Sequence, residues 1–262
     1  MPRLTDVVKN LLIINVLMFL AGYVLSTDML ALYYPGSDKF QPFQLVTHFF
    51  MHGSPMHLLF NMWALVMFGV VLETVWGPKK FLFFYLFCAF GAALLHIAVD
   101  FYSINQLQSL LASFSDSPNY ADFKHFLDKI NMGMLTVDGR ERTNEVMALL
   151  QEGDTRGADF AKNLMQQFID AKMNVPVVGA SGAIFGLLLG FGMLFPENEL
   201  MLIFLPVPIK AKYFIPLLIL VELFLGVNHF SWDNIAHFAH LGGALFGFLL
   251  ILYWRKTGEQ LY

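Results

Sequence analysis

Long apolar stretches are the feature of this sequence that most constrains its fold. They cover roughly residues 8–27, 56–76, 79–100, 178–195, 212–230 and 235–254. Each holds about the 20 mostly apolar residues that a helix needs to cross the hydrocarbon core of a bilayer. The composition agrees, since 57% of the residues are hydrophobic, 14% are charged and the mean hydropathy is +0.59. We therefore predict an all-α polytopic membrane protein, a bundle with six transmembrane helices.

Lysine and arginine in the short loops predict the orientation of the bundle. Basic pairs precede the first stretch, divide the second from the third and the fourth from the fifth, and follow the sixth: Arg3/Lys9, Lys79/Lys80, Lys210/Lys212 and Arg255/Lys256. The opposite short loops hold only Lys39. With six crossings all the pairs face one side. We expect both termini in the cytoplasm, an inner membrane of bacterial type, and a first helix that is not cleaved as a signal peptide.

The segment 101–175 is polar and breaks this pattern. Apolar residues recur in it at helical spacing, for example Phe123, Phe126 and Leu127, and Ser117-Pro118 is a candidate helix start. We expect an extracytoplasmic helical insertion between helices 3 and 4. It would divide the bundle into residues 1–100, with helices 1–3, and residues 176–262, with helices 4–6.

Several function classes lack their sequence signals. The chain has no Gly-rich phosphate loop after a strand, no cluster of metal-binding cysteines and no basic aromatic face. Its one cysteine, Cys88, lies in an apolar run and is expected to be a packing residue. We expect no cofactor, no metal and no nucleic-acid partner.

Polar side chains at membrane depth are costly, so each is a candidate functional residue. In "HGSPMHLLFNMW" His57 and Asn61 are four residues apart on one helix face, and His52 precedes that helix. In "GASGAIFGLLLG" a stripe of glycines explains close helix packing but not Ser181. In "NIAHFAHLGGALFGF" the imidazole of His240 lies above a glycine groove. Taken singly, each stretch is also compatible with hydrogen bonds that hold helices together.

Two glutamates also lie in apolar stretches. Glu73 is near the basic residues at the end of the second stretch, where an interfacial or interhelical hydrogen bond is a sufficient role. Glu222 in "LILVELFLG" is deeper and must face the bundle. A structural, hydrogen-bonded role is favoured for Glu222 over a role in transport.

The polar groups gain meaning when they are taken together. Under the predicted topology, Ser181, His240, His57 and Asn61 lie near the extracytoplasmic ends of helices 4, 6 and 2. A serine nucleophile requires a base within hydrogen-bond reach, and the oxyanion requires preorganised donors. The start of helix 4 adds backbone N–H groups and a positive dipole end at the serine. These are the parts of an acyl-transfer site.

At these residues the chain resembles the rhomboid family of intramembrane serine proteases. "HGSPMHLLFNM" is similar to the family motif H-x(4)-H-x(3)-N, "GASGAIFG" to G-x-S-G and "AHFAHLGGALFG" to A-H-x-x-G. The resemblance covers roughly 43–100 and 175–250. It implies a six-helix fold and an endopeptidase that cleaves single-pass transmembrane substrates near the extracytoplasmic surface of the bilayer.

The resemblance also implies roles for individual residues. Ser181 would be the nucleophile and His240 the general base, a dyad without a carboxylate. The oxyanion hole and cavity would be formed by His57, Asn61, His52, Gly179 of the G-x-S-G motif and the Ser181 N–H, with Phe185 packed on the dyad histidine. The chain departs from the family pattern at Phe43-Gln44, where many members carry Trp-Arg in the loop after helix 1.

Two other functions compete with proteolysis. A non-catalytic relative would bind and sort membrane clients, but such relatives usually lack the serine or the histidine. A transporter would use Glu222 and the membrane histidines, but the sequence shows no inverted repeat or pair of broken helices. The sequence leaves the substrate's identity and the oligomeric state open.

Overall fold

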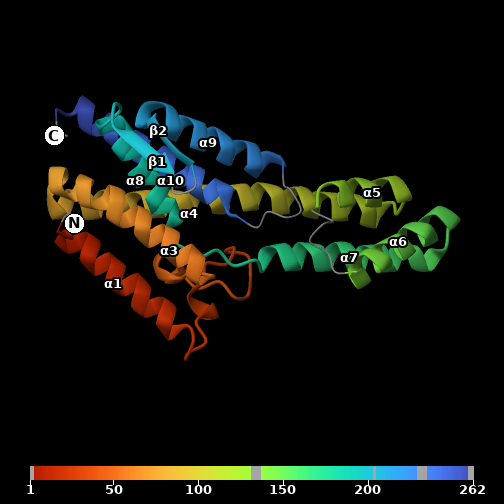
Figure 1. Cartoon of the computed structure of the whole chain (residues 1–262). Coiled ribbons are helices and arrows are strands. Elements are labelled where there is room, and N and C mark those ends of the chain that lie inside the picture. The colour runs from red at the N-terminus through yellow and green to blue at the C-terminus, as the bar shows by residue number, and fades with distance from the viewer. Residues whose placement is uncertain (1–2, 131–136, 203–204, 229–234, 259–262) are drawn as a thin grey trace.

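The computed structural model describes residues 3–130, 137–202, 205–228 and 235–258. The chain is mostly helical (Figure 1). Its α-helices are α1 Asp6–Ala21, α2 Gln44–Thr47, α3 Pro55–Ala64, α4 Val70–Asp116, α5 Tyr120–Asp128, α6 Val137–Glu152, α7 Thr155–Met173, α8 Ser181–Leu194, α9 Ala211–Asn228 and α10 His237–Lys256. Shorter helical segments are η1 Asp28–Leu30, η2 His48–Phe50 and the π-helical η3 Leu65–Gly69. Some predicted ranges reach beyond the described residues. These are the start of 1–100, the part of 101–175 at 131–136, the end of the stretch 212–230 and the end of the domain 176–262.

Only part of the predicted membrane topology is reproduced. Among the described residues, three helical segments are long and apolar enough to cross a membrane: Pro55–Asp116, Ala211–Asn228 and His237–Lys256. Helix α8 is apolar but has 14 residues, and α1 has 16. At 1.5 Å per residue, α8 is about 21 Å long, which is shorter than a typical hydrocarbon core. The count of six crossings stays a prediction.

The segment Pro55–Asp116 contains two of the predicted stretches. Gly77, with φ 77° and ψ 165°, interrupts α4 and is followed by Pro78. Positive φ is accessible to glycine, and proline lacks the N–H that would continue the helix. The chain reverses direction here. Evidence for this is that a Cβ placed on Gly69 would be 3.3 Å from the ring of Phe81, twelve positions later. The break between residues 76 and 79 therefore falls where the sequence predicts it.

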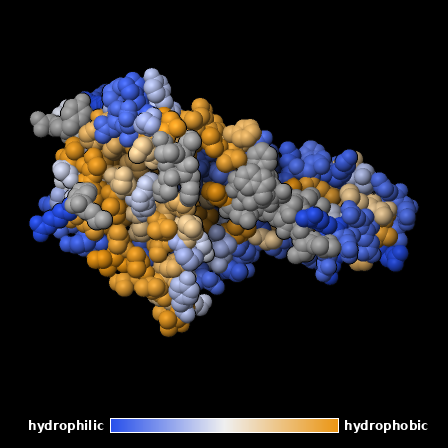
Figure 2. Space-filling view, viewed as in Figure 1, coloured by the Kyte–Doolittle hydropathy of each residue, from blue (hydrophilic) through white to orange (hydrophobic). Residues whose placement is uncertain are grey.

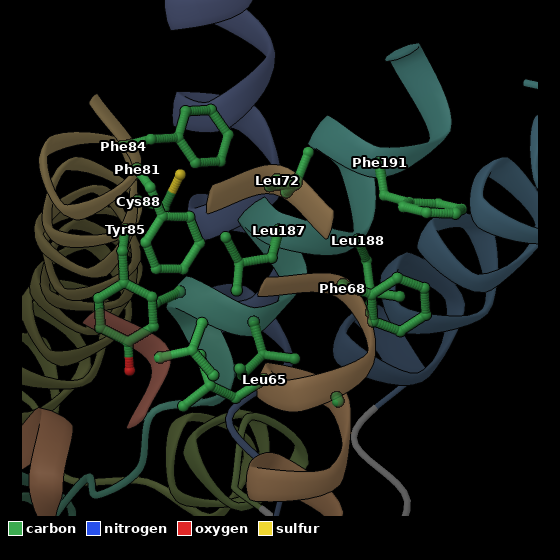
Figure 3. Packing of buried hydrophobic residues seen from close by; sticks show 14 of the residues in the cluster. Leu65, Phe68, Leu72, Phe81, Phe84, Tyr85, Cys88, Leu187, Leu188 and Phe191 are labelled. Carbon is green, nitrogen blue, oxygen red and sulfur yellow. The ribbon is translucent and has the colours of Figure 1, made fainter. Parts of the chain in front are cut away.

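The core is built around α8, α4 and α10, each of which packs against the other two. Leu187, Leu188 and Phe191 of α8 face apolar side chains from η3 and α4 (Figure 3). Glycines permit this close approach: a Cβ on Gly182 would collide with Ala92 of α4, and one on Gly243 of α10 would collide with the carbonyl oxygen of Gly182. Because the glycines bring the three backbones together, α8 is enclosed by protein despite its short length.

Local structure differs from the expectations in two places. The chain is mostly helical as predicted, but β1 Glu199–Leu202 and β2 Leu205–Lys210 form an antiparallel hairpin between α8 and α9 that the sequence did not predict. The first helix of the polar segment is capped by Asn119, whose side chain accepts a hydrogen bond from Asp122 N at 2.9 Å, and does not start at Ser117-Pro118. Asn119 has the extended backbone of an N-cap and a side-chain acceptor at the right distance from the first turn.

The polar segment has a hydrophobic cluster of its own. Helix α4 does not end near residue 100 but continues to Asp116. Helices α5 and α7 pack along this extension, and α6 packs on α7 and α5. Buried residues from these helices include Phe114, Phe123, Phe126 and Met165. Figure 1 shows α5, α6 and α7 projecting from one end of the molecule. The domain boundary at residue 101 thus lies inside a continuous helix.

The outer surface carries many exposed apolar side chains. On α1, α9 and α10 they include Leu17, Leu220, Phe224 and Tyr253, each about 60% exposed. Figure 2 shows hydrophobic colour over the helical bundle and more hydrophilic colour over the projecting α5–α7 end. Side chains of this kind would be unstable in water over so large an area, so the chain has the surface of an integral membrane protein.

The predicted basic sites gather at one end of the bundle. Lys80 lies 4.4 Å from the centre of the Trp254 ring, and Arg255 donates to the Met193 carbonyl at 3.0 Å. Lys212 and Lys210 bind Glu197 and lower the pKa of that exposed carboxyl to about 2. Both marked chain ends lie at this end in Figure 1.

Glu73 ties the first helix to the bundle at the same end. It accepts hydrogen bonds from the N–H groups of Val7 and Val8, each at 2.9 Å, and from Thr5 Oγ1 at 2.5 Å. A carboxylate at a helix N-terminus satisfies unpaired donors and interacts favourably with the dipole.

We expect Glu73→Ala to lower stability, because it leaves these donors of α1 without partners in a buried place. The cost is about 1–3 kcal/mol for each buried donor that stays unpaired. The midpoint of thermal unfolding in detergent measures it. Asp6→Ala is the matched control, since it removes an exposed carboxylate from the same turn. Equal midpoints for the two variants would contradict the assigned role.

Candidate active site

Ser181 is the first residue of α8 and follows a non-helical segment, residues 175–180, that backbone hydrogen bonds hold in place. Leu32 and Val177 form an isolated antiparallel bridge, with N–H to O distances of 2.9 and 2.8 Å. Two residues later, Gly179 N donates to the carbonyl of His48 at 2.9 Å. The loop after α1 therefore fixes the approach to the nucleophile candidate. The N–H groups of the first turn of α8 surround Ser181 with donors.

Gln44 holds that loop together. It is fully buried, its Nε2 donates to the carbonyls of Met29 and Lys39 at 3.0 and 2.9 Å, and its Oε1 accepts from Tyr33 N at 3.3 Å. Phe43, in contrast, is 42% exposed. At the place where the sequence departs from the family pattern, one glutamine thus joins three points of the loop by hydrogen bonds.

Ser181 and His240 are brought into contact by the packing of α8 on α10. Oγ of Ser181 lies 2.9 Å from Nε2 of His240. The ring of Phe185, one turn along α8, is stacked on the imidazole with centroids 4.3 Å apart and planes at 8°. A hydroxyl, a ring nitrogen and a supporting aromatic face therefore meet near the start of both helices.

The second ring nitrogen of His240 also has a partner. Glu222 Oε2, from α9, lies 2.9 Å from Nδ1 of His240 and 2.7 Å from Nδ1 of His237. The sequence indicated that Glu222 must be hydrogen-bonded, but it did not join this residue to Ser181. The sequence did hold a signal that could have joined them. Glu222 and His240 lie at similar distances in sequence from the connection between α9 and α10, and such residues in two antiparallel helices lie at a similar level in the bundle.

Helix α3 supplies the donors predicted for an oxyanion. It begins at Pro55 after Ser54, whose hydroxyl accepts from His57 N at 3.1 Å. Asn61, four residues after His57, is buried, and its Nδ2 has no hydrogen-bond partner among the described residues. An unpaired buried donor is costly unless a ligand or water binds to it. This amide therefore has the state expected of a group kept for an incoming oxygen.

Gly179 lets His57 approach the serine. Its φ is +123°, and a Cβ at this position would be 2.9 Å from both Cε1 and Nε2 of His57 and 3.6 Å from Oγ of Ser181. His57, Gly179 and Ser181 therefore border one small space. A side chain at residue 179 would fill it.

His52 lies beside this group, in the loop before α3. Its ring is 5.1 Å from that of His57, centroid to centroid, and nearly edge-on to it. Burial, and then the neighbouring imidazole of His57, lower the pKa of His52 to about 4. His52 is therefore neutral at pH 7.

A small cavity of about 20 Å³ opens on Ser181, and small apolar residues make up most of its lining, with His48 as a polar member. The described residues that line it do not include His57, Asn61 or His240. A space of this size holds about one water molecule.

Ligand atoms of Glu222, His237 and His240 lie within 4.8 Å of one another, so these three could also hold a metal ion.

The fold and site define a class: a polytopic helical membrane protein with a serine–histidine pair near the N-terminal ends of two closely packed helices. Residues 39–110 and 155–257 match the Rhomboid domain. The match covers more than half of the chain, so the chain belongs to the rhomboid family, and the resemblance stated from its motifs is confirmed.

Two curated relatives match parts of the chain. Rhomboid-like protein 15 of Arabidopsis thaliana is 29% identical over 96 residues, which are 37% of this chain and 21% of that protein. Rhomboid protein 1, mitochondrial, of Saccharomyces cerevisiae is 36% identical over 85 residues, 32% of this chain and 24% of that protein. The aligned part thus spans less than a quarter of either relative.

We expect Gly179→Ala to destabilise the protein and to displace His57. A non-glycine residue in this backbone region is strained by about 1–3 kcal/mol, and the new methyl group meets the imidazole. The unfolding midpoint measures the strain. Gly53→Ala is the control in the same region, because a Cβ there meets nothing within 4 Å and no positive φ is required. A smaller effect at residue 179 than at residue 53 would refute this account.

Proposed function

We propose that this chain is an intramembrane serine endopeptidase in which Ser181 is the nucleophile and His240 the general base. The observation that carries the proposal is the 2.9 Å contact between Ser181 Oγ and His240 Nε2 inside a rhomboid fold. A base in hydrogen-bond contact with a serine hydroxyl is what nucleophilic attack on an amide requires. Membership of the family alone does not carry this conclusion.

The proposed chemistry has two stages. Ser181 Oγ attacks the peptide carbonyl and His240 accepts the hydroxyl proton, which it then gives to the leaving amine as the C–N bond breaks. Water, activated by His240, hydrolyses the acyl-enzyme and restores Ser181. In both stages the tetrahedral oxyanion accepts hydrogen bonds from the Ser181 N–H, Asn61 and His57.

The proposed substrates are single-pass transmembrane helices. A helical peptide bond is shielded by its own hydrogen bonds, so it must unwind locally before attack. Glycine or proline near the scissile bond would favour unwinding. The proposed cleavage position is near the extracytoplasmic surface of the bilayer, because Ser181 lies at the end of α8 opposite to the basic cluster around Lys80 and Arg255.

The proposed orientation follows from the same cluster. Basic residues favour the cytoplasmic side, so we place both chain ends there and α5–α7 on the other side. In this arrangement the polar segment of residues 101–175 is an extracytoplasmic insertion that adjusts substrate access. Residues 111–154 of it lie outside the match to the Rhomboid domain. The two relatives come from a plant and a yeast and give no support to a bacterial inner membrane.

We expect Ser181→Ala and His240→Ala each to abolish both cleavage of a single-pass test substrate and labelling by a fluorophosphonate probe. The probe reacts only with an activated serine, so it separates a protease from a client-binding relative. Ser115→Ala is the matched control, because its hydroxyl only bonds the Leu111 carbonyl within α4. If the wild-type chain is folded and remains unlabelled, the proposed function fails and the client-binding alternative replaces it.

We expect Asn61→Ala to slow cleavage without abolishing it. Removal of one oxyanion donor costs about 10²–10³ in kcat in other enzymes, and the remaining donors bring this loss toward the lower limit. Turnover of a slowly cleaved substrate, with chemistry as the slow step, is the measurement. Asn15→Ala on α1 removes another buried amide, which donates to the Leu11 carbonyl within its own helix, and should leave kcat unchanged. Equal rates in the two variants would make Asn61 a structural residue.

A further inference from the structure

A carboxylate stands behind the Ser181–His240 pair. Glu222 comes from α9 and is buried, with 8% of its surface exposed. Its Oε2 is 2.9 Å from Nδ1 of His240, while Nε2 of the same ring is 2.9 Å from Ser181 Oγ. Carboxylate, imidazole and hydroxyl thus form one line of hydrogen bonds through α9, α10 and α8. The resemblance to the family implies a serine and a histidine without a carboxylate, so Glu222 is not among the residues to which it gives a role.

The carboxylate selects the tautomer of the imidazole. An ionised carboxylate only accepts hydrogen bonds, so the contact with Glu222 requires a proton on Nδ1 of His240. A neutral imidazole carries one ring proton, and Nε2 is therefore left with a lone pair that faces Ser181. Only this tautomer can accept the serine's proton. The other tautomer would point an N–H at the hydroxyl.

The position of the ring is fixed from three sides. Glu222 holds one ring nitrogen, Ser181 the other, and Phe185 covers one face at 4.3 Å. When His240 accepts a proton it becomes an imidazolium in a site with little water. A carboxylate in contact stabilises that charge far more there than it would in bulk water.

His237 braces the carboxylate itself. Its Nδ1 is 2.7 Å from the same Oε2, and a Cβ placed on Gly226 of α9 would be 3.0 Å from the Cβ of His237. The start of α10 is therefore packed closely against α9 one turn beyond Glu222. Two ring nitrogens on one oxygen leave Glu222 little freedom to turn away from His240.

The observed spacing favours hydrogen bonds over a metal site. Ligand atoms around a tetrahedral zinc ion, at about 2.0–2.1 Å from it, are about 3.3 Å apart. The two nitrogen–oxygen distances here, 2.7 and 2.9 Å, are those of direct hydrogen bonds. A metal would also take the Nδ1 lone pair of His240 and remove the proton that the carboxylate binds.

We propose that Glu222 is a positioning residue for His240, so that this chain works with a Ser181–His240–Glu222 triad, braced by His237. This inference rests on the proposed protease function. During turnover the proton passes from Ser181 Oγ to His240 Nε2 and then to the leaving amine, while Glu222 keeps its charge and the Nδ1 proton stays on the ring.

The test uses the full chain in detergent or liposomes and the variants Glu222→Gln and Glu222→Ala. We expect both to lower kcat by about 10²–10⁴-fold with little change in KM, by analogy with loss of the triad carboxylate in soluble serine proteases. Glu222→Gln is the sharper variant, since it keeps the volume and loses the charge. A glutamine variant with the wild-type kcat would overturn the proposal, because a merely structural role needs shape and hydrogen bonds but no charge.

Glu73→Gln is the matched control, since it neutralises the other buried glutamate of the apolar helices, on α4 and bound to α1. We expect it to lower the unfolding midpoint and to leave kcat unchanged. Labelling separates the two hypotheses: an unlabelled wild type refutes the protease function, whereas a labelled wild type with fully active Glu222 variants refutes only the triad.

Two measurements on the wild type do not depend on the folding of a Glu222 variant. Nitrogen NMR of ¹⁵N-histidine, with His240→Ala to assign the signal, should show the His240 proton on Nδ1, and a proton on Nε2 would overturn the proposal. Treatment with EDTA should leave probe labelling intact. Labelling that is lost with EDTA and restored by Zn²⁺ would identify Glu222, His237 and His240 as metal ligands and refute the triad.

Discussion

Contact between three glycine-lined backbones is the constraint on which the site depends. Gly182 and Gly243 have no side chains to separate α8 from α10, and Ala92 completes the contact on α4. Ser181 immediately precedes one of these glycines, and His240 lies one turn before the other. The distance between hydroxyl and imidazole is therefore set by backbone packing and not by flexible side chains. Any larger residue at the contact would separate the helices and the reacting groups together.

The same enclosure explains how polar backbone is tolerated in an apolar fold. Residues 175–180 are not helical, and such backbone is stable at membrane depth only where protein surrounds it. Here the loop after α1 supplies the bridge to Val177 and the carbonyl that accepts from Gly179 N, and Gln44 holds that loop in shape. The loop and the short helix therefore depend on each other. Helix α8 can begin at Ser181 only if the backbone N–H and C=O groups of the preceding segment have hydrogen-bond partners in that loop.

The sequence predicted the features that follow from strong local constraints. Apolar length indicated the helices, the gap between residues 76 and 79 indicated the reversal, and motif spacing indicated the family. It did not predict the β1–β2 hairpin or the continuation of α4 to Asp116, because those depend on packing between segments distant in sequence. Gln44 was visible only as a departure, since its role depends on carbonyls of Met29 and Lys39 that no periodicity relates to it.

Glu222 illustrates why a costly group persists in such a fold. A buried carboxylate is destabilising unless its hydrogen bonds repay the loss of hydration, and pairs of this kind often add little to stability. Two imidazoles on one oxygen satisfy Glu222, yet an apolar residue at the α9–α10 contact would avoid the cost altogether. The network is therefore better explained by what it does to His240 than by what it adds to folding. A carboxylate in this buried place stabilises the site most when a positive charge appears beside it. In the proposed mechanism, the proton that His240 would accept from Ser181 creates that charge.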